Sequence, residues 1–204
     1  MASEVSICNA ALQLVKHTTQ ITSLSQGTKQ ATACEVIYEE MRDTLLEMHT
    51  WNFATSRVKL ARLVATPVFE WSYGYQLPAD FLRAVSVHEN ANSFGATPYK
   101  IEGGHINTDA TDLYLRYIQR VSDPNLMPPT FRSALTKLLG SRLAVALAQS
   151  MSLSEKLYAQ FLDQDLPTAK STDAVQGHAD DLPESSWISA RYGGARNYEP
   201  GEVS

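Results

Sequence analysis

A calcium loop is the first chemistry that the acidic residues suggest. Asp163 and Asp165 stand one residue apart, downstream of Glu155, and their spacing is typical of the start of a calcium-binding loop. The positions that follow in such a loop supply a further oxygen ligand and an invariant glycine, whereas this chain continues with Leu166 and Pro167. We therefore interpret the three acids as the solvated surface of a helix, and the sequence predicts no metal site.

Hydrolysis is the second chemistry. A hydrolase that works with paired acids needs two carboxyl groups facing each other across a cleft. Asp80 with Asp109 or Asp112 is the only pairing worth considering. Asp109 and Asp112 stand beside Asn107 and Thr108, a cluster that favours turns. The sequence therefore predicts no catalytic residue, and a hydrolase is kept only as an alternative.

The motifs that identify common enzymes and zinc sites are missing. The sequence has no Cys-x-x-Cys, no Gly-x-Ser-x-Gly and no Gly-Lys-Ser phosphate loop. None of its histidines has a second histidine or a cysteine at the short spacing of a helical zinc site. The five histidines are His17, His49, His88, His105 and His178. We predict a protein that is not an enzyme and that uses no cofactor.

The two cysteines indicate the redox state of the compartment in which the protein folds. Cys8 and Cys34 both fall on apolar stripes of predicted helices. We interpret them as buried free thiols in a reducing compartment, with a disulfide between the two helices as the alternative. The first residues lack the basic and apolar segments of a signal peptide, and the longest aliphatic run, residues 143–148, is too short to span a bilayer. We expect a protein that folds in the cytoplasm and has no membrane partner.

The charge argues against nucleic acid as a tightly held ligand. Lysine and arginine number 17 against 22 acidic residues, which gives a net charge of -5. Proteins that bind by neutralising phosphates are usually basic. The few grouped cations are interpreted as interface salt bridges or as edge residues that block stray strand pairing, with a local DNA contact as the alternative. They are Arg57, Lys59 and Arg62, and Arg116 with Arg120, which could share a sheet edge.

Apolar spacing predicts two helices at the start of the chain. Residues 3–16 have apolar side chains at steps of three and four, with Ser3 as N-cap. Residues 28–49 carry a stripe close to a heptad seam. Its outer face is charged, and we interpret it as solvated, with a neighbouring subunit as the alternative. The charged residues are Glu35, Glu39, Glu40, Arg42 and Asp43.

The middle of the chain changes to the period of strands. Residues 55–122 alternate apolar and polar side chains, with breaks at Pro67 and Pro78. Phe69 to Tyr75 is predicted to be extended with its aromatic rings on one face, Gly103-Gly104 to turn a hairpin, and residues 90–96 to form a loop. These patterns predict one small, mostly antiparallel sheet.

Two more helices are predicted after the sheet. Pro129 suits the first turn of a helix that runs to Met151. Ser152 and Glu155 have the spacing of a capping box that begins the next, and Pro167 should kink that helix or set a boundary.

The predicted fold class is α+β, mainly α. It has a four-helix bundle-like body, a small antiparallel sheet inserted between helices two and three, and an extended C-terminal arm. The corresponding segments are an N-terminal helical hairpin, residues 1–54; the sheet region, residues 55–122; a C-terminal helical pair, residues 123–176; and the arm, residues 177–204.

The arm has no periodicity, yet it is rich in aromatic side chains. A disordered tail is normally poor in aromatics, so we infer either an arm that orders on a partner or a strap packed on its own domain. Its candidate binding residues are Trp187, Ile188, Arg191, Tyr192, Arg196 and Tyr198.

The densest apolar stretches lie where the second helix gives way to the sheet. Trp51-Asn52-Phe53-Ala54 ends the helical hairpin, and residues 75–83 begin the sheet region proper. We predict that these stretches pack at a helix–sheet junction. The packing residues are Trp51, Phe53, Tyr75, Leu77, Pro78 and Phe81.

These blocks, in this order, resemble the tail tubular protein A family, the head-to-tail adaptors of short-tailed bacteriophages. The resemblance reaches about residue 176. Besides the junction blocks, it rests on packing residues at four further places. They are Ile7-Cys8-Asn9 with Ala11-Leu12; Ile21 with Leu24; Ala33-Cys34, Tyr38, Arg42-Asp43 and Leu45; and Leu115, Tyr117 and Ile118 before Pro128-Pro129 and Phe131. Val15-Lys16 departs from the Leu-Gly that relatives often carry at the end of the first helix.

The resemblance implies a structural protein of the virion neck, assembled in the host cytoplasm. It implies a dodecameric ring beneath the portal protein that extends the DNA channel, lets DNA pass without specific binding, and carries the tail nozzle protein and, in some phages, tail fibres. The arm would grip the portal or an adjacent subunit. The alternatives are a DNA-packaging or DNA-binding accessory protein and a tail-associated hydrolase.

Overall fold

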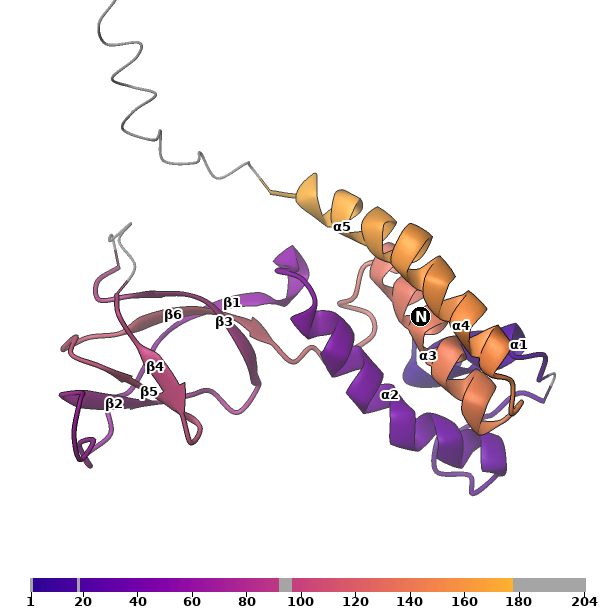
Figure 1. Ribbon diagram of the computed structural model, residues 1–204, viewed down its shortest axis with the longest axis horizontal. Coiled ribbons are helices and arrows are strands. Elements are labelled where there is room, and N and C mark those ends of the chain that lie inside the picture. The colour runs from indigo at the N-terminus through magenta and orange to yellow at the C-terminus, as the bar shows by residue number, and fades with distance from the viewer. Residues whose placement is uncertain (1, 18, 92–96, 178–204) are drawn as a thin grey trace, which may run out of the picture.

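The computed structural model describes residues 2–17, 19–91 and 97–177. Helices begin and end the described chain, and the strands lie between them in the sequence (Figure 1). The helices are α1 (Glu4–Leu14), α2 (Lys29–Glu47), α3 (Pro129–Ala146), α4 (Met151–Gln160) and α5 (Leu166–Ala174). The strands are β1 (Thr55–Lys59), β2 (Tyr73–Gln76), β3 (Phe81–His88), β4 (Lys100–Glu102), β5 (His105–Thr108) and β6 (Tyr114–Gln119). The fold class is α+β, as predicted.

The first helix begins at the cap that the sequence indicated, and the second begins just after Thr28, where its start was predicted. The Ser3 hydroxyl accepts a hydrogen bond from the Ser6 backbone N–H, and the Ser6 hydroxyl accepts one from the Ser3 N–H. Thr28 accepts from the Ala31 N–H at the start of α2. Each cap satisfies backbone donors that have no partner inside the helix, so the start is decided locally.

The helix after α3 begins earlier than predicted. Ser150, and not Ser152, is the N-cap, because its hydroxyl accepts from the Leu153 N–H at 3.3 Å. The turn before it places Gln149 at a φ of 51°. As a result α3 ends at Ala146, short of the predicted Met151, which instead opens α4.

Pro167 was predicted either to kink the helix or to set a boundary, and it lies at a boundary between helical segments. The chain passes from α4 through a π-helical turn, Phe161–Asp165, into α5, and Pro167 lies in the first turn of α5. A π turn is wider than an α turn, so the proline ring is accommodated without ending the helix.

The strands form two antiparallel sheets, and the prediction of a single sheet is wrong. One sheet has the order β1-β6-β3 and the other β2-β5-β4. The predicted hairpin is present between β4 and β5, where Gly103 and Gly104 adopt φ values of 55° and 81°. Alternation identifies the buried face of each strand but not its partner, and here β1 pairs with β6 rather than with β2.

The extended segment predicted from Phe69 starts later, at Tyr73. Glu70 has a φ of 68°, which interrupts an extended backbone. Phe69 therefore lies outside the sheet and is 73% exposed, whereas Tyr75 is buried.

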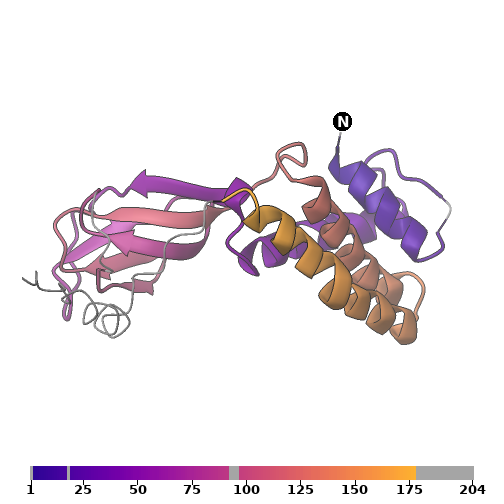
Figure 2. The ribbon, with the colours of Figure 1, turned by 90° about the horizontal axis from the view of Figure 1, so that it is seen from above.

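Two apolar cores hold the molecule together. In Figure 2 the helices gather at one end and the strands at the other. Helix α3 packs against α1, α2, α4 and α5 and so lies at the centre of the helical core. The second core lies between the two sheets. The fully buried large residues of the first include Leu12, Tyr38, Leu45, Trp51, Phe131 and Phe161, and those of the second include Tyr75, Ile106, Leu113 and Leu115.

Strand β6 serves both cores. Tyr117 packs in the core between the sheets, whereas the next residue, Ile118, is buried in the helical core. Adjacent side chains of a strand point to opposite faces, so one strand can contribute to two cores. This strand therefore ties the two ends of the molecule together.

Cys8 and Cys34 are free and buried where α1 meets α2. This agrees with the interpretation as free thiols, not with the alternative disulfide. A hydrogen bond with Cys34 and burial raise the pKa of the Cys8 thiol.

Candidate functional site at the helix–sheet junction

Trp51 anchors the end of α2 in the helical core. It is 1% exposed, and its indole Nε1 donates to the carbonyl of Leu45 at 2.9 Å. Its ring meets Phe131 of α3 edge to face, with centroids 5.1 Å apart, and Phe53 meets the same phenyl ring at 4.9 Å. Edge-to-face contacts of this kind add stability beyond the area they bury. Trp51 and Phe53 therefore pack at the junction as predicted.

The remaining predicted junction residues are not brought together with Trp51. Tyr75, Leu77 and Phe81 belong to the core between the sheets. The Tyr75 hydroxyl donates to the carbonyl of Ala110 at 2.8 Å. Pro78 is half-buried in the turn before β3, where its carbonyl accepts from the Phe81 N–H. The predicted packing set is thus divided between two cores.

A polar contact missed by the sequence analysis completes the junction. The buried carboxylate of Asp173 on α5 accepts from the backbone N–H of Asn52 at 3.0 Å. The Asn52 side-chain amide donates to the backbone carbonyl of Asp173 at 2.7 Å and to its carboxylate at 3.2 Å. The two residues are 121 positions apart, so no local pattern signals the contact.

His49 lies on the exposed side of this contact. Its Nε2 is 3.8 Å from the Asp173 carboxylate, and its ring meets Trp51 edge to face. Burial lowers the pKa of His49, although the carboxylate opposes that shift. Burial raises the pKa of Asp173, and the Asn52 N–H and His49 oppose the change. In both residues the effect of burial on the pKa is larger than the opposing effect of the charged or hydrogen-bonding partner.

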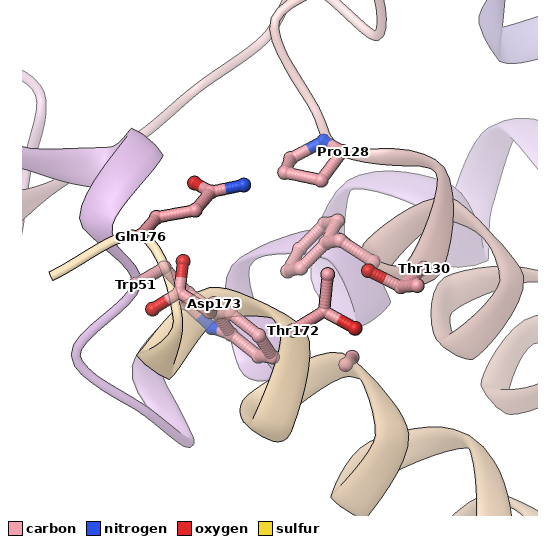
Figure 3. Close-up of a pocket in the computed structure, with 8 residues that line it drawn as sticks. Trp51, Pro128, Thr130, Thr172, Asp173 and Gln176 are labelled. Carbon is pink, nitrogen blue, oxygen red and sulfur yellow. The ribbon is translucent and has the colours of Figure 1, made fainter.

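A small hollow adjoins the junction. Figure 3 shows Trp51 and Asp173 on one side of it and Pro128 and Thr130 on the other. Its empty volume is about 180 Å³, part of which is open solvent. Pockets for small molecules usually measure about 300–1,000 Å³. The hollow is therefore too small for a small-molecule substrate.

The acids that suggested calcium do not form a metal site. No group of three or more histidine, cysteine, aspartate or glutamate side chains in residues 2–17, 19–91 and 97–177 could hold an ion. Asp163 and Glu155 lie on the exposed helix surface, and Asp165 accepts from the Ser133 hydroxyl at 3.1 Å.

The carboxylates that suggested a hydrolase are occupied separately. Asp80 accepts from the Tyr117 hydroxyl at 3.1 Å, and Asp112 pairs with Lys59 at 2.9 Å. Asp109 accepts from the backbone N–H and the hydroxyl of Ser72.

Their positions also oppose a hydrolytic pair. The Asp80 carbonyl accepts from the N–H of Arg120, just past one end of β6, whereas Asp112 precedes the other end. At ~3.3 Å per residue the strand separates them by roughly 20 Å, more than glycoside hydrolysis allows. Asp109 comes directly after Thr108 of β5, which pairs with Tyr73 at the start of β2. Asp80 comes after the other end of β2, so these two carboxylates are also separated.

The grouped cations are only partly as expected. Arg57 and Lys59 lie on β1, which is an edge strand, in agreement with the interpretation as edge residues. Arg116 lies on the central strand, so it does not share an edge with Arg120. Arg120 instead reaches Asp43 of α2 at 2.8 Å. Arg62 lies over the ring of Tyr73.

Two exposed surfaces carry large apolar side chains. Val64, Val68 and Phe69 lie in the connection between β1 and β2, and all three are more than two thirds exposed, at 103%, 97% and 73%. Met151, Tyr158 and Leu162 lie at steps of seven and four along the last helical segments, which places them on one face.

The predicted binding residues of the arm, Trp187 to Tyr198, lie outside the described residues. The described chain ends at Gly177, whose N–H donates to the carbonyl of Ala174 at the end of α5. A Cβ on Gly177 would stand 3.6 Å from the Asn52 amide nitrogen. The described chain therefore ends beside the contact between Asp173 and Asn52.

Comparison with protein-family models found no match, and comparison with curated proteins found none either. In the part of the chain that the structure describes, no helix has the length and apolar character needed to cross a membrane.

Proposed function

We propose that the chain is a structural protein of a short-tailed phage virion, a head-to-tail adaptor. It forms a dodecameric ring between the portal protein and the tail nozzle protein, extends the DNA channel and has no enzymatic activity. The proposal rests first on the resemblance of the packing blocks up to residue 176. The arrangement of helices around α3, with all strands between α2 and α3 in the chain, agrees with the bundle and inserted sheet that the family implies.

The observation that carries the proposal is the fixed origin of the arm. Asp173 accepts from both nitrogens of Asn52, and Gly177 follows one helical turn later beside the same amide. The aromatic anchors of the arm begin ten residues after this fixed point, and large aromatic side chains are the residues that most often anchor a segment in a groove on a partner. We therefore assign portal or neighbouring-subunit binding to Trp187, Ile188, Arg191, Tyr192, Arg196 and Tyr198.

The exposed apolar surfaces support the same function. An adaptor needs separate contacts for the portal above and the nozzle below. The surface with Phe69 and the surface with Tyr158 lie on different elements, one in the strand half and one in the helical half. Two such surfaces on a small protein are expected of a subunit that has a partner at each end.

The test is reconstitution with the portal and nozzle proteins of the same phage genome. The full chain mixed with portal should form a stacked ring visible by electron microscopy, and this ring should then recruit the nozzle protein. A chain ending at Gly177 should keep its circular dichroism spectrum and lose portal binding. Normal portal binding by the truncated chain would remove the assignment of the arm, and failure of the full chain to bind either protein would remove the adaptor function.

A further inference from the structure

Two arginines stand directly opposite each other on neighbouring strands. Arg57 of β1 is the register partner of Arg116 of β6. Like charges in this position repel, because their side chains are only about 4.5–5.5 Å apart at Cβ. Neither arginine forms a salt bridge with any carboxylate of residues 2–17, 19–91 and 97–177. In the isolated chain this pair is unfavourable.

The pair also leaves a polar atom without a partner. The Nε of Arg116 is buried and makes no hydrogen bond within the described chain. A covered donor of this kind costs free energy unless something supplies an acceptor. Both arginines lie on the face of the sheet that points away from the second sheet, since their neighbours Val58 and Leu115 pack between the sheets. We call Arg57 and Arg116 the arginine face.

A surface of opposite charge lies on α2. Glu35, Glu39 and Glu40 are exposed, and they form no salt bridge with any described residue. They surround Val36, which is 70% exposed although it is apolar. We call these four residues the acidic face.

The two faces match in spacing as well as in charge. Glu35 and Glu39 are one helical turn apart, so their Cβ atoms are separated by ~5–6 Å. That is close to the separation of the two arginines across the strands. Guanidinium groups bind carboxylates through two parallel hydrogen bonds.

We propose that the arginine face of one copy of this chain binds the acidic face of the next copy. In Figure 1 the β1–β6–β3 sheet and α2 lie in different halves of the molecule. A contact between two different surfaces is head-to-tail and leaves one of each free for further copies, so it builds a ring when the rotation closes. This inference deepens the proposed adaptor function and rests on it for closure into a ring.

The experiment measures self-association of the full chain by sedimentation velocity at high protein concentration. The unmodified protein should associate at low salt and dissociate as salt screens the charges. The variant Arg57→Glu/Arg116→Glu and the variant Glu35→Arg/Glu39→Arg should each weaken association by about tenfold or more, since each places like charges across the contact. Circular dichroism melting of each variant establishes that it is folded.

A mixture of the two variants supplies the decisive comparison. Every contact between unlike variants again pairs glutamate with arginine, so the equimolar mixture should recover the association that each variant lacks. The proposal is overturned if the unmodified protein stays monomeric at low salt, if the variants associate as strongly as it does, or if the mixture recovers nothing. It is also overturned if Arg57→Glu/Arg116→Glu abolishes binding of a labelled DNA duplex while self-association is unchanged.

Binding of the charge variants to the portal distinguishes a failure of this inference from a failure of the proposed function. If both charge variants form the same ring on the portal as the unmodified protein, the contact between copies is wrong and the adaptor function stands. If charge exchange restores association but no copy binds the portal, the contact is right and the adaptor function is wrong.

Discussion

Asp173 on α5 accepts hydrogen bonds from both nitrogens of Asn52, the residue that follows Trp51 at the end of the helical hairpin. The carboxylate is 4% exposed and belongs to the last turn of the last helix. It thereby joins the end of the described chain to the point where the helices meet the strands.

Replacing Asp173 should destabilise the protein strongly. Asp173→Ala removes the carboxylate that accepts from both nitrogens of Asn52, and we expect the free energy of unfolding to fall by about 1.5–3 kcal/mol. Asp163→Ala is the matched control, because Asp163 lies exposed in the π-helical turn that precedes α5. It should change stability by less than about 0.5 kcal/mol. Urea unfolding followed by circular dichroism measures both, and equal effects would contradict the role of Asp173.

Stability should rise with pH in the range just below 6.5 because of His49. Burial lowers the pKa of this histidine below its usual value of 6.5. The unfolded chain therefore binds more protons than the folded one between the two pKa values, and stability increases as pH rises through that interval. His49→Gln should flatten this part of the curve in urea unfolding at a series of pH values. An unchanged slope in the variant would assign the dependence to another group.

Trp51 and Trp71 should respond differently to the same substitution. The indole N–H of Trp51 donates to Leu45, whereas the buried indole nitrogen of Trp71 has no partner in the described chain. Trp51→Phe should cost about 1–3 kcal/mol from the lost hydrogen bond and the smaller ring. Trp71→Phe removes an unsatisfied donor and should be neutral or stabilising. Thermal melting of the two variants gives the comparison, and a larger loss in Trp71→Phe would contradict it.

The hairpin between β4 and β5 should depend on Gly104. Its φ is 81° and no atom lies within 4 Å of the position of an added Cβ, so only backbone strain opposes a side chain. Gly104→Ala should destabilise by about 1 kcal/mol, and Gly104→Asn by less, because asparagine adopts left-handed conformations more readily. If both variants melted with the unmodified protein, the turn would not constrain the fold.

The cysteines should react only in the unfolded protein. Cys8 and Cys34 are both completely buried, and the raised pKa of Cys8 further reduces its thiolate fraction. A disulfide reagent should detect no thiol at neutral pH in buffer and two in denaturant. Rapid labelling of the native protein would contradict the packing of α1 against α2.

Local signals were sufficient for some element starts but not for how the elements meet. The Ser3 cap and the Gly103-Gly104 turn act within a few residues, so the sequence alone predicts them correctly. At the start of α4 two serines compete, and the choice of Ser150 over Ser152 depends on how the preceding turn leaves α3.

Contacts between residues far apart in the chain could not be predicted from the sequence, for a physical reason. The division into two sheets depends on β6 pairing with β1 and β3, and alternation within a strand contains no information about its neighbours. The bond between Asn52 and Asp173 likewise joins two residues that are each ordinary for a turn or an exposed helix. Even the junction residues were divided, since Tyr75 and Phe81 have the same apolar character whichever core they enter.

The alternation of Tyr117 and Ile118 between the two cores has a mechanical consequence. Neither half of the molecule can loosen without pulling β6 away from the other, so the helices and the sheets should lose structure in a single cooperative step. A load applied at the strand end would then be transmitted along this strand into the helical core through Ile118. We therefore expect the subunit to behave as one rigid body, in which the distance between the helical end and the strand end stays constant.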